Sequence, residues 1–170
     1  MPADFRTIAP RMSLIGETAA PMFNGLYQLG FVTDDLDAAQ ERLGRRFGVS
    51  RFRVRLDPLR NSTAHAYAGD MMIEIIRPGA QSNPVYLENV PTGGSVRLHH
   101  LGYRVPDVAN WDLLLARIGR EGWETPVRGA VMEGHLRFVY VDTLADLGIY
   151  QEYVCLTGPA VHLYDDVPAN

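Results

Sequence analysis

The pattern of hydrophobic and polar positions occurs twice along the chain. The segment Gln28-Leu29-Gly30-Phe31 is matched by His100-Leu101-Gly102-Tyr103, and an amphipathic helical stripe follows each segment. Three strand-like segments come after each stripe. Self-similarity of this kind indicates one structural unit used twice. The pattern therefore predicts two β-α-β-β-β modules, over 25–79 and 97–157, joined by a Gly- and Pro-rich linker over 80–96 and flanked by extensions over 1–24 and 158–170.

Each module is predicted to contain one helix with a single apolar face. Thr33 or Asp34 is the expected N-cap of the first helix, which Gly48 ends, and Asp107 opens the second, which Gly122 ends. The apolar positions recur at helical spacing, at Leu36, Ala39, Leu43 and Phe47 and then at Val108, Trp111, Leu115 and Ile118. After the helices, strands are expected at 50–56, 64–68, 71–77, 125–128, 136–142 and 148–156.

Alternation along a strand decides which side chains share a face. In the first strand Gln28 faces one side, and the more apolar side, with Tyr27, Leu29 and Phe31, is expected to meet the helix. In the matching strand His100 and Arg104 share a face, and His99 is expected to point the other way. Gln28 and His100 therefore occupy equivalent positions in the two modules.

The last strand of each module contains a single carboxylate. Glu74 lies within Met71-Met72-Ile73-Glu74-Ile75-Ile76, and Glu152 lies within Tyr150-Gln151-Glu152-Tyr153-Val154. A carboxylate in an apolar strand is costly unless it is paired, exposed or bound to a cation. Both modules thus bring one polar residue on the first strand and one glutamate on the last.

These segments give the chain its resemblance to the vicinal oxygen chelate superfamily, the glyoxalase, bleomycin-resistance and extradiol dioxygenase group. The resemblance covers about residues 26–156. It implies an α+β fold in which two βαβββ modules form an incomplete eight-stranded barrel. It also implies a divalent metal ion, held on the concave floor by the first and last strands of each module.

Carried over residue by residue, the resemblance implies Gln28, Glu74, His100 and Glu152 as metal ligands. Their order is similar to that of some glyoxalase I enzymes, although no glutathione-binding residues are matched. The stretch from the linker into His99-His100 is more similar to methylmalonyl-CoA epimerases and other glyoxalase-like proteins. Three oxygen donors and one imidazole suit Zn, Ni, Co, Mn or Fe(II).

Arginines next to the expected cavity suggest that the substrate carries a negative charge. Arg51, Arg53 and Arg55 alternate with apolar residues, which is typical of a solvated edge strand but also fits an anion clamp. Arg104 shares the face of His100. We therefore take Arg104 and Arg53 as candidate substrate-binding residues, for a small and anionic molecule.

Composition removes several classes of function. All 16 basic residues among the 170 are arginine, so no lysine is available for a Schiff base, a pyridoxal phosphate anchor or a phosphate loop. Cys155 is the only cysteine, which excludes an internal disulfide and a zinc site built on two thiolates. A net charge of −4 without a basic cluster argues against nucleic-acid binding, and no apolar run is long enough for a membrane span. We expect a cytoplasmic protein.

The leading functional hypothesis is a metal-dependent enzyme that chelates its substrate through vicinal oxygens and moves a proton, as an isomerase, epimerase or glyoxalase-type lyase. With no lysine, thiol or spare inward histidine, the glutamates remain as candidates for the base. The resemblance to glyoxalase I implies a base on the last strand of the second module, which makes Glu152 the first choice and Glu74 the second. The alternatives are an Fe(II) extradiol-type dioxygenase and a metal-free binding or resistance protein. Two curved modules with open strand edges also lead us to expect a homodimer.

Overall fold

A computed structural model describes residues 25–88 and 90–170, and the extension predicted over 1–24 lies outside the described residues. The first module contains β1 (Leu26–Val32), α1 (Leu36–Phe47), β2 (Arg53–Arg55), β3 (Asn61–Ala68) and β4 (Met71–Pro78). The second contains β5 (Arg97–Val105), α3 (Val108–Glu121), β6 (Val127–Val131), β7 (Leu136–Val141) and β8 (Tyr150–Leu156). The shorter elements are α2 (Pro84–Leu87), η1 (Met132–Gly134), α4 (Leu144–Leu147) and η2 (Gly158–His162).

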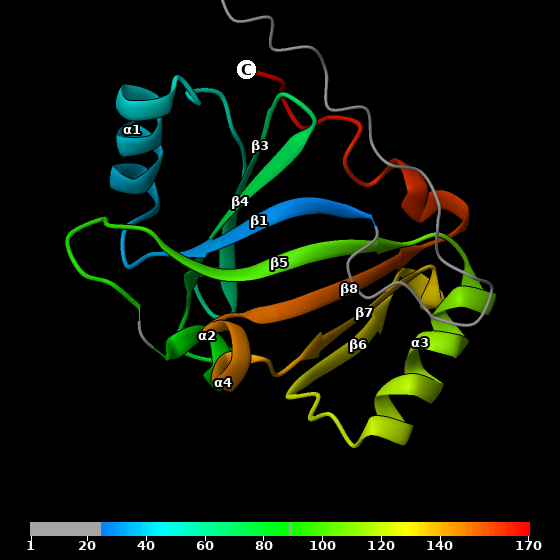
Figure 1. Cartoon of the computed structure of the whole chain (residues 1–170). Coiled ribbons are helices and arrows are strands. Elements are labelled where there is room, and N and C mark those ends of the chain that lie inside the picture. Colours follow the sequence, from blue (N-terminus) through cyan, green and yellow to red (C-terminus); the bar gives the residue numbers. More distant parts are fainter. Residues whose placement is uncertain (1–24, 89) are drawn as a thin grey trace, which may run out of the picture.

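The strands form one eight-stranded sheet in the order β2-β3-β4-β1-β5-β8-β7-β6 (Figure 1). Within each module the first and last strands run parallel, β1 with β4 and β5 with β8. The two modules meet where β1 pairs antiparallel with β5. This curled sheet confirms the predicted α+β fold of two βαβββ modules in an incomplete barrel. The four strands that carry the predicted ligands are its central strands.

The two long helices each cover strands of their own module. Leu36, Ala39 and Leu43 of α1 are buried against β3 and β4, while Trp111, Leu114 and Ile118 of α3 pack against β5, β7 and β8. The predicted cap of α1 was wrong, because the Asp35 carboxylate accepts the N–H groups of Asp37 and Ala38. Phe47, the last residue of the predicted apolar face of this helix, is 70% exposed, whereas Val49, just after the helix, is buried.

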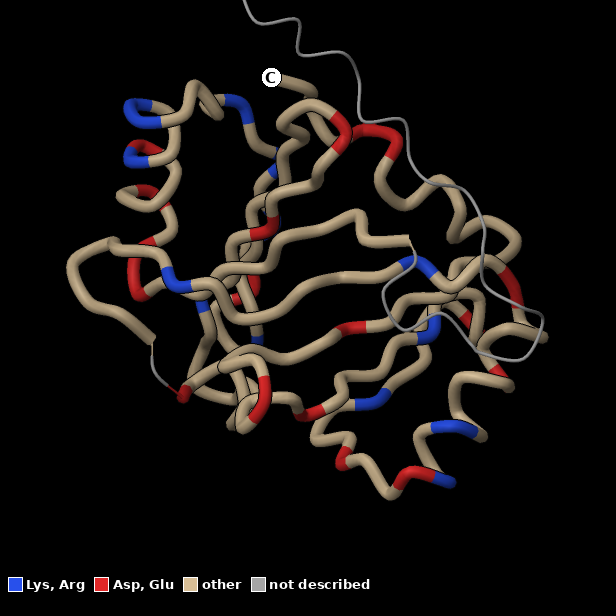
Figure 2. Tube along the Cα trace, in the orientation of Figure 1, with Lys and Arg blue, Asp and Glu red and all other residues tan. Residues whose placement is uncertain are grey.

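Charged positions are interspersed along the trace in both modules (Figure 2). The predicted strand at 50–56 is shorter than expected, since only Arg53–Arg55 pair with β3 at the edge of the sheet. No helix in the described part of the chain is both long and apolar enough to cross a membrane.

Two irregularities in the pairing of β1 with β5 redirect side chains. The register shifts between Leu26 and Gln28 and again where Gly30 pairs with His100 but Phe31 pairs with Leu98. Such bulges place neighbouring side chains out of the regular alternation. His99 therefore lies against His100, with ring centroids 5.3 Å apart, and the expectation that it points away was wrong. Tyr27 likewise packs in the cluster around Val154 and Leu156 instead of meeting the helix.

Two glycines give the central strands their close side-chain arrangement. Gly30 pairs with both Glu74 and His100, and Gly102 pairs with both Glu152 and Gln28. A Cβ at Gly30 would lie 1.9 Å from Cε1 of His100, and a Cβ at Gly102 would lie 2.6 Å from Oε1 of Gln28. Each module thus supplies a glycine over which a polar side chain of the other module lies.

We expect Gly30→Ala to destabilise the protein, because the added methyl group overlaps the buried imidazole of His100. Overpacking of this kind costs about 1–3 kcal/mol. Gly119→Ala is the matched control, since nothing lies within 4 Å of a Cβ at this position of α3 and alanine is the better helix former by about 1 kcal/mol. Urea unfolding measures both variants. A Gly30→Ala protein as stable as the parent would contradict the packing described here.

Candidate metal centre

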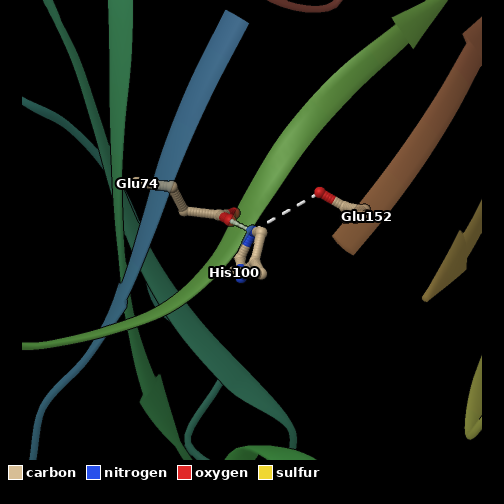
Figure 3. Close-up of side chains that lie close together, drawn as sticks. All are labelled: Glu74, His100 and Glu152. Carbon is tan, nitrogen blue, oxygen red and sulfur yellow. Dashed lines mark ion pairs between the residues drawn. The ribbon is translucent and has the colours of Figure 1, made fainter. Parts of the chain in front are cut away.

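Three ligand-type side chains converge on the inner face of the sheet (Figure 3). Glu74 on β4, His100 on β5 and Glu152 on β8 each place a ligand atom within 4.8 Å of the others. Nε2 of His100 lies 3.3 Å from an oxygen of Glu74 and 3.4 Å from an oxygen of Glu152. His100 is fully buried, and 13% of each glutamate side chain is exposed. The imidazole therefore lies between two carboxylates that belong to different modules.

Gln28 adds a fourth donor to this face. Its side chain is buried, its Oε1 lies against Gly102, and Gly102 is the strand neighbour of Glu152. Among the described residues, Oε1 of Gln28 is one of the few buried side-chain atoms without a hydrogen-bond partner, and Nε2 of His100 has only its ion-pair contacts with the two carboxylates. Buried polar atoms without partners are rare, and coordination of an ion satisfies them. This observation fits the donor set of a divalent cation.

The hydrogen bonds of His99 fix which nitrogen of His100 carries a proton. Nε2 of His99 lies 2.9 Å from the carbonyl oxygen of Val85, so this nitrogen donates. Burial, and then the charge of His100, lower the pKa of His99 to about 4, which keeps its ring neutral. Nδ1 of His99 is therefore an acceptor, and Nδ1 of His100, at 3.0 Å, donates to it. Nε2 of His100 is left facing the two carboxylates.

The two carboxylates favour a positive charge between them, at the imidazole of His100. Burial opposes a charged imidazole, but Glu152 and Glu74 outweigh it and raise the pKa of His100 to about 9. Burial also favours a neutral Glu74, but its contacts with His100 and His65 outweigh this and hold the pKa of Glu74 well below its usual range. A proton or a metal ion on Nε2 of His100 would supply the charge that two carboxylates demand.

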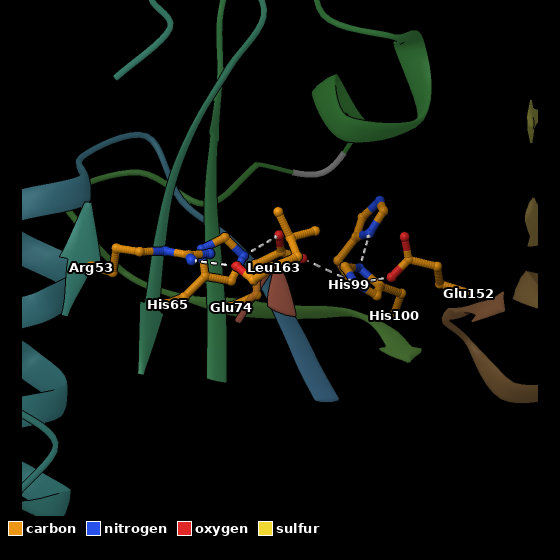
Figure 4. Close-up of polar contacts among 7 residues, drawn as sticks. All are labelled: Arg53, His65, Glu74, His99, His100, Glu152 and Leu163. Carbon is orange, nitrogen blue, oxygen red and sulfur yellow. Dashed lines mark hydrogen bonds and ion pairs between the residues drawn. The ribbon is translucent and has the colours of Figure 1, made fainter. Parts of the chain in front are cut away.

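His65 is a participant that our sequence analysis did not find. It lies on β3 directly opposite Glu74, and its Nε2 donates to Oε1 of Glu74 at 3.0 Å (Figure 4). The sequence does contain a signal for this contact. Gly69 and Asp70 form a two-residue connection between Ala68 and Met71, and that hairpin register pairs His65 with Glu74.

Aromatic rings make up part of the surroundings of the histidines. Tyr86 from α2 stacks on His99 with centroids 5.2 Å apart, and Tyr140 from β7 meets His100 edge-on at 5.2 Å. The ring centroids of Tyr150 and His99 lie 5.1 Å apart. These contacts hold both imidazoles in fixed orientations and exclude water from them.

The two arginines predicted to bind substrate both lie over the ring of Tyr164, Arg104 at 5.3 Å and Arg53 at 5.6 Å from its centroid. The Arg104 guanidinium also stands over the Tyr27 ring at 4.5 Å. Arg53 donates to the carbonyl oxygen of Leu163 at 2.7 Å (Figure 4) and also pairs with Asp166. Their role in substrate binding stays a prediction.

Residues 27–140 match the family model of the Glyoxalase/Bleomycin resistance protein/Dioxygenase superfamily. Because the match spans more than half of the chain, the chain belongs to this superfamily. The resemblance found in the sequence is thereby confirmed.

Solved structures with the same fold include methylmalonyl-CoA epimerases. The enzyme of Streptomyces coelicolor, in complex with 2-nitronate-propionyl-CoA, has a TM-score of 0.55 at 18% identity, covering 79% of this chain and 99% of that one. The epimerase of Mycobacterium tuberculosis has a TM-score of 0.54 at 16% identity, covering 79% and 89%. A hypothetical protein of Bacillus halodurans has a TM-score of 0.56 at 14% identity, covering 81% and 98%. No curated protein matches significantly in sequence.

We expect His99→Phe to weaken binding of a divalent metal ion by about 10- to 100-fold, as loss of an orienting partner commonly does. Phenylalanine keeps the ring contacts but cannot accept the proton on Nδ1 of His100. Tyr150→Phe is the control, because it changes the same aromatic cluster and leaves the His99 contacts in place. Competition with a metallochromic indicator gives the affinities, and equal affinities for the two variants would refute the role of His99.

Proposed function

We propose that the protein is a metal-dependent enzyme that moves a proton at a carbon next to a carbonyl group, as an isomerase or epimerase. The observation that carries this proposal is the convergence of Glu74, His100 and Glu152. Gln28, with its unpartnered buried oxygen, completes a set of one nitrogen and three oxygen donors. Superfamily membership and the epimerase fold support the same class of reaction.

These four side chains would hold the metal ion, and the ion would supply Lewis acidity that makes a neighbouring carbon acid easier to deprotonate. Such donors accept Zn, Ni, Co, Mn or Fe(II). The neutral Nε2 of His100, presented by His99, and the two carboxylates would balance the charge of a divalent ion.

Glu152 and Glu74 differ in their fitness to take the proton. Glu74 is held by His65 and His100, and the lowered pKa of its carboxyl makes it a weak base. Glu152 contacts His100 from the other module. We therefore assign Glu152 as the base. An epimerase also needs a second group on the opposite face of the carbon, and we propose Glu74, which comes from the other module, for that role.

The substrate class follows from the same chemistry. A molecule with two neighbouring oxygens and an acidic C–H bond would use the metal and Glu152 together. The epimerases with this fold are described in complex with propionyl-CoA and methylmalonyl-CoA compounds. For this chain we propose a small carbonyl compound with an anionic group, for which Arg104 is the candidate partner. A homodimer and a cytoplasmic location belong to the same proposal.

The donor set bears on the alternatives. An extradiol dioxygenase uses two histidines and one carboxylate as metal ligands. Here the second histidine, His99, uses both ring nitrogens in hydrogen bonds with Val85 and His100, so it does not provide that ligand. A metal-free binding protein has no use for two glutamates around a buried histidine. A glyoxalase-type lyase shares the proton transfer and is separated from an isomerase by its products.

Elemental analysis of the purified protein tests the metal. We expect about one equivalent of a divalent metal per chain and a loss of that metal in His100→Ala, because the only imidazole of the donor set is removed. His135→Ala is the control, since His135 contacts Thr157 away from the cluster. Absence of metal from both parent and variant, even after reconstitution, would favour the binding protein.

Glu152→Gln tests the base. Glutamine keeps an oxygen donor but lacks basicity, so metal should stay bound while proton transfer slows by a factor on the order of 10² to 10⁴. Exchange of the substrate α-proton with deuterated solvent, followed by NMR, is the measurement, with methylmalonyl-CoA as the first probe. Exchange in the variant as fast as in the parent would show that another residue takes the proton.

A further inference from the structure

The chain beyond β8 crosses the molecule from one module to the other. After η2, residues 163–170 run from the end of β8 in the second module to β2 and β3 in the first, as the red end of the chain shows in Figure 1. We call residues 158–170 the strap. Ala160 and Val167 are buried, so the strap is packed against the domain at both ends of this path.

Polar contacts fasten the far end of the strap to the first module. Tyr67 of β3 donates its N–H to the carbonyl oxygen of Pro168 at 2.8 Å and accepts the N–H of Asn170 at 3.0 Å. The side chain of Asn170 accepts the N–H groups of Ser50 and Arg51 at 2.9 and 2.8 Å. Arg53 reaches back to Leu163 and Asp166.

Tyr164 is the strap residue that faces the candidate metal centre. Its ring lies 5.8 Å from His65, the partner of Glu74, and 6.4 Å from the ring of Tyr27. Two guanidiniums flank it, with Arg104 at 5.3 Å and Arg53 at 5.6 Å from the ring centroid. Burial, and then the charges of Glu74 and Glu152, raise the pKa of its hydroxyl, so that it stays protonated.

We propose that the strap is a movable cover of the metal centre and that Tyr164 limits the size of the molecule that reaches the metal. The inference rests on the proposed metal site, and it explains why both candidate substrate arginines contact the strap. A ligand that reaches a metal ion between Glu74 and Glu152 would have to approach from the side of the sheet on which Tyr164 lies. A compact ligand enters beside Tyr164, whereas a bulky ligand requires the strap to leave β2 and β3.

The fastening of the strap is suited to opening. The side-chain hydrogen bonds of Asn170 with Ser50 and Arg51 are exposed. The link to β2 includes the pair of Arg53 with Asp166, in which the side chain of Arg53 is 25% exposed and that of Asp166 is 72% exposed. Exposed ion pairs contribute about 0–1 kcal/mol. His162 and Asp165 form a second exposed pair, but this pair lies within the strap and holds nothing across the site.

Extraction of bound Co²⁺ by two dianionic chelators of different size tests the cover. Dipicolinate is compact and bathophenanthroline disulfonate is bulky. In Tyr164→Ala we expect the bulky chelator to extract cobalt about tenfold faster or more, since its rate depends on the population of open strap. The compact chelator should gain much less. Both rates are read from the visible absorption of the cobalt complexes.

Two adjacent carboxylates provide the matched variants. Asp166→Asn loosens the link to β2 and should also favour the bulky chelator, whereas Asp165→Asn breaks only the pair within the strap and should leave both rates unchanged. The proposal is overturned if Tyr164→Ala and Asp166→Asn behave like Asp165→Asn. It is equally overturned if both chelators gain by the same factor, which indicates general loosening of the site.

Amide hydrogen exchange tests the opening of the strap independently of the proposed metal site. If neither parent nor Tyr164→Ala takes up Co²⁺, the proposed metal function fails, and the strap is then judged by the amide of Tyr67. This N–H is bonded to Pro168 of the strap. Faster exchange at Tyr67 in Asp166→Asn than in Asp165→Asn supports a strap that opens, and equal exchange refutes it.

Discussion

The site depends on one steric constraint. Each of two glycines on the central strands contacts a polar side chain of the other module. Gly30 lies between Glu74 and His100, and Gly102 lies between Glu152 and Gln28. Because a glycine has no Cβ, the side chain of the next strand can lie over it and approach the carboxylate beyond. The same three-residue arrangement is used twice, related by the pseudo-symmetry of the modules. Any larger residue at either glycine would push the two halves of the donor set apart.

That arrangement creates an electrostatic demand that the rest of the fold meets. Two carboxylates with a buried imidazole between them are stable only when a positive charge is present. His99 determines where on the imidazole that charge is held, and His99 is itself fixed by the carbonyl of Val85 in α2. The linker between the modules therefore contributes to the orientation of a ligand at the centre of the sheet. His65 does the same for Glu74 from β3.

The sequence was sufficient for the architecture and for the positions of the polar residues on the central strands. A repeat requires no knowledge of tertiary contacts, and an isolated glutamate in an apolar strand is conspicuous because its burial is costly. The directions of His99 and Tyr27 could not be predicted in this way. Strict alternation assumes a regular strand, and the bulges between β1 and β5 break it. Tyr164 carried no local signal, because its position depends on a strap whose partners lie about a hundred residues away.

The strap also completes the edge of the sheet. β2 pairs with β3 only as far as His65, so the last residues of β3 would otherwise present free backbone groups along that edge. Pro168 and Asn170 occupy this stretch through Tyr67. An uncovered strand edge readily pairs with another chain. Whenever the strap detaches, this edge is uncovered together with the polar centre, so long-lived opening carries a risk of self-association, and brief opening is the form of motion the fold can tolerate.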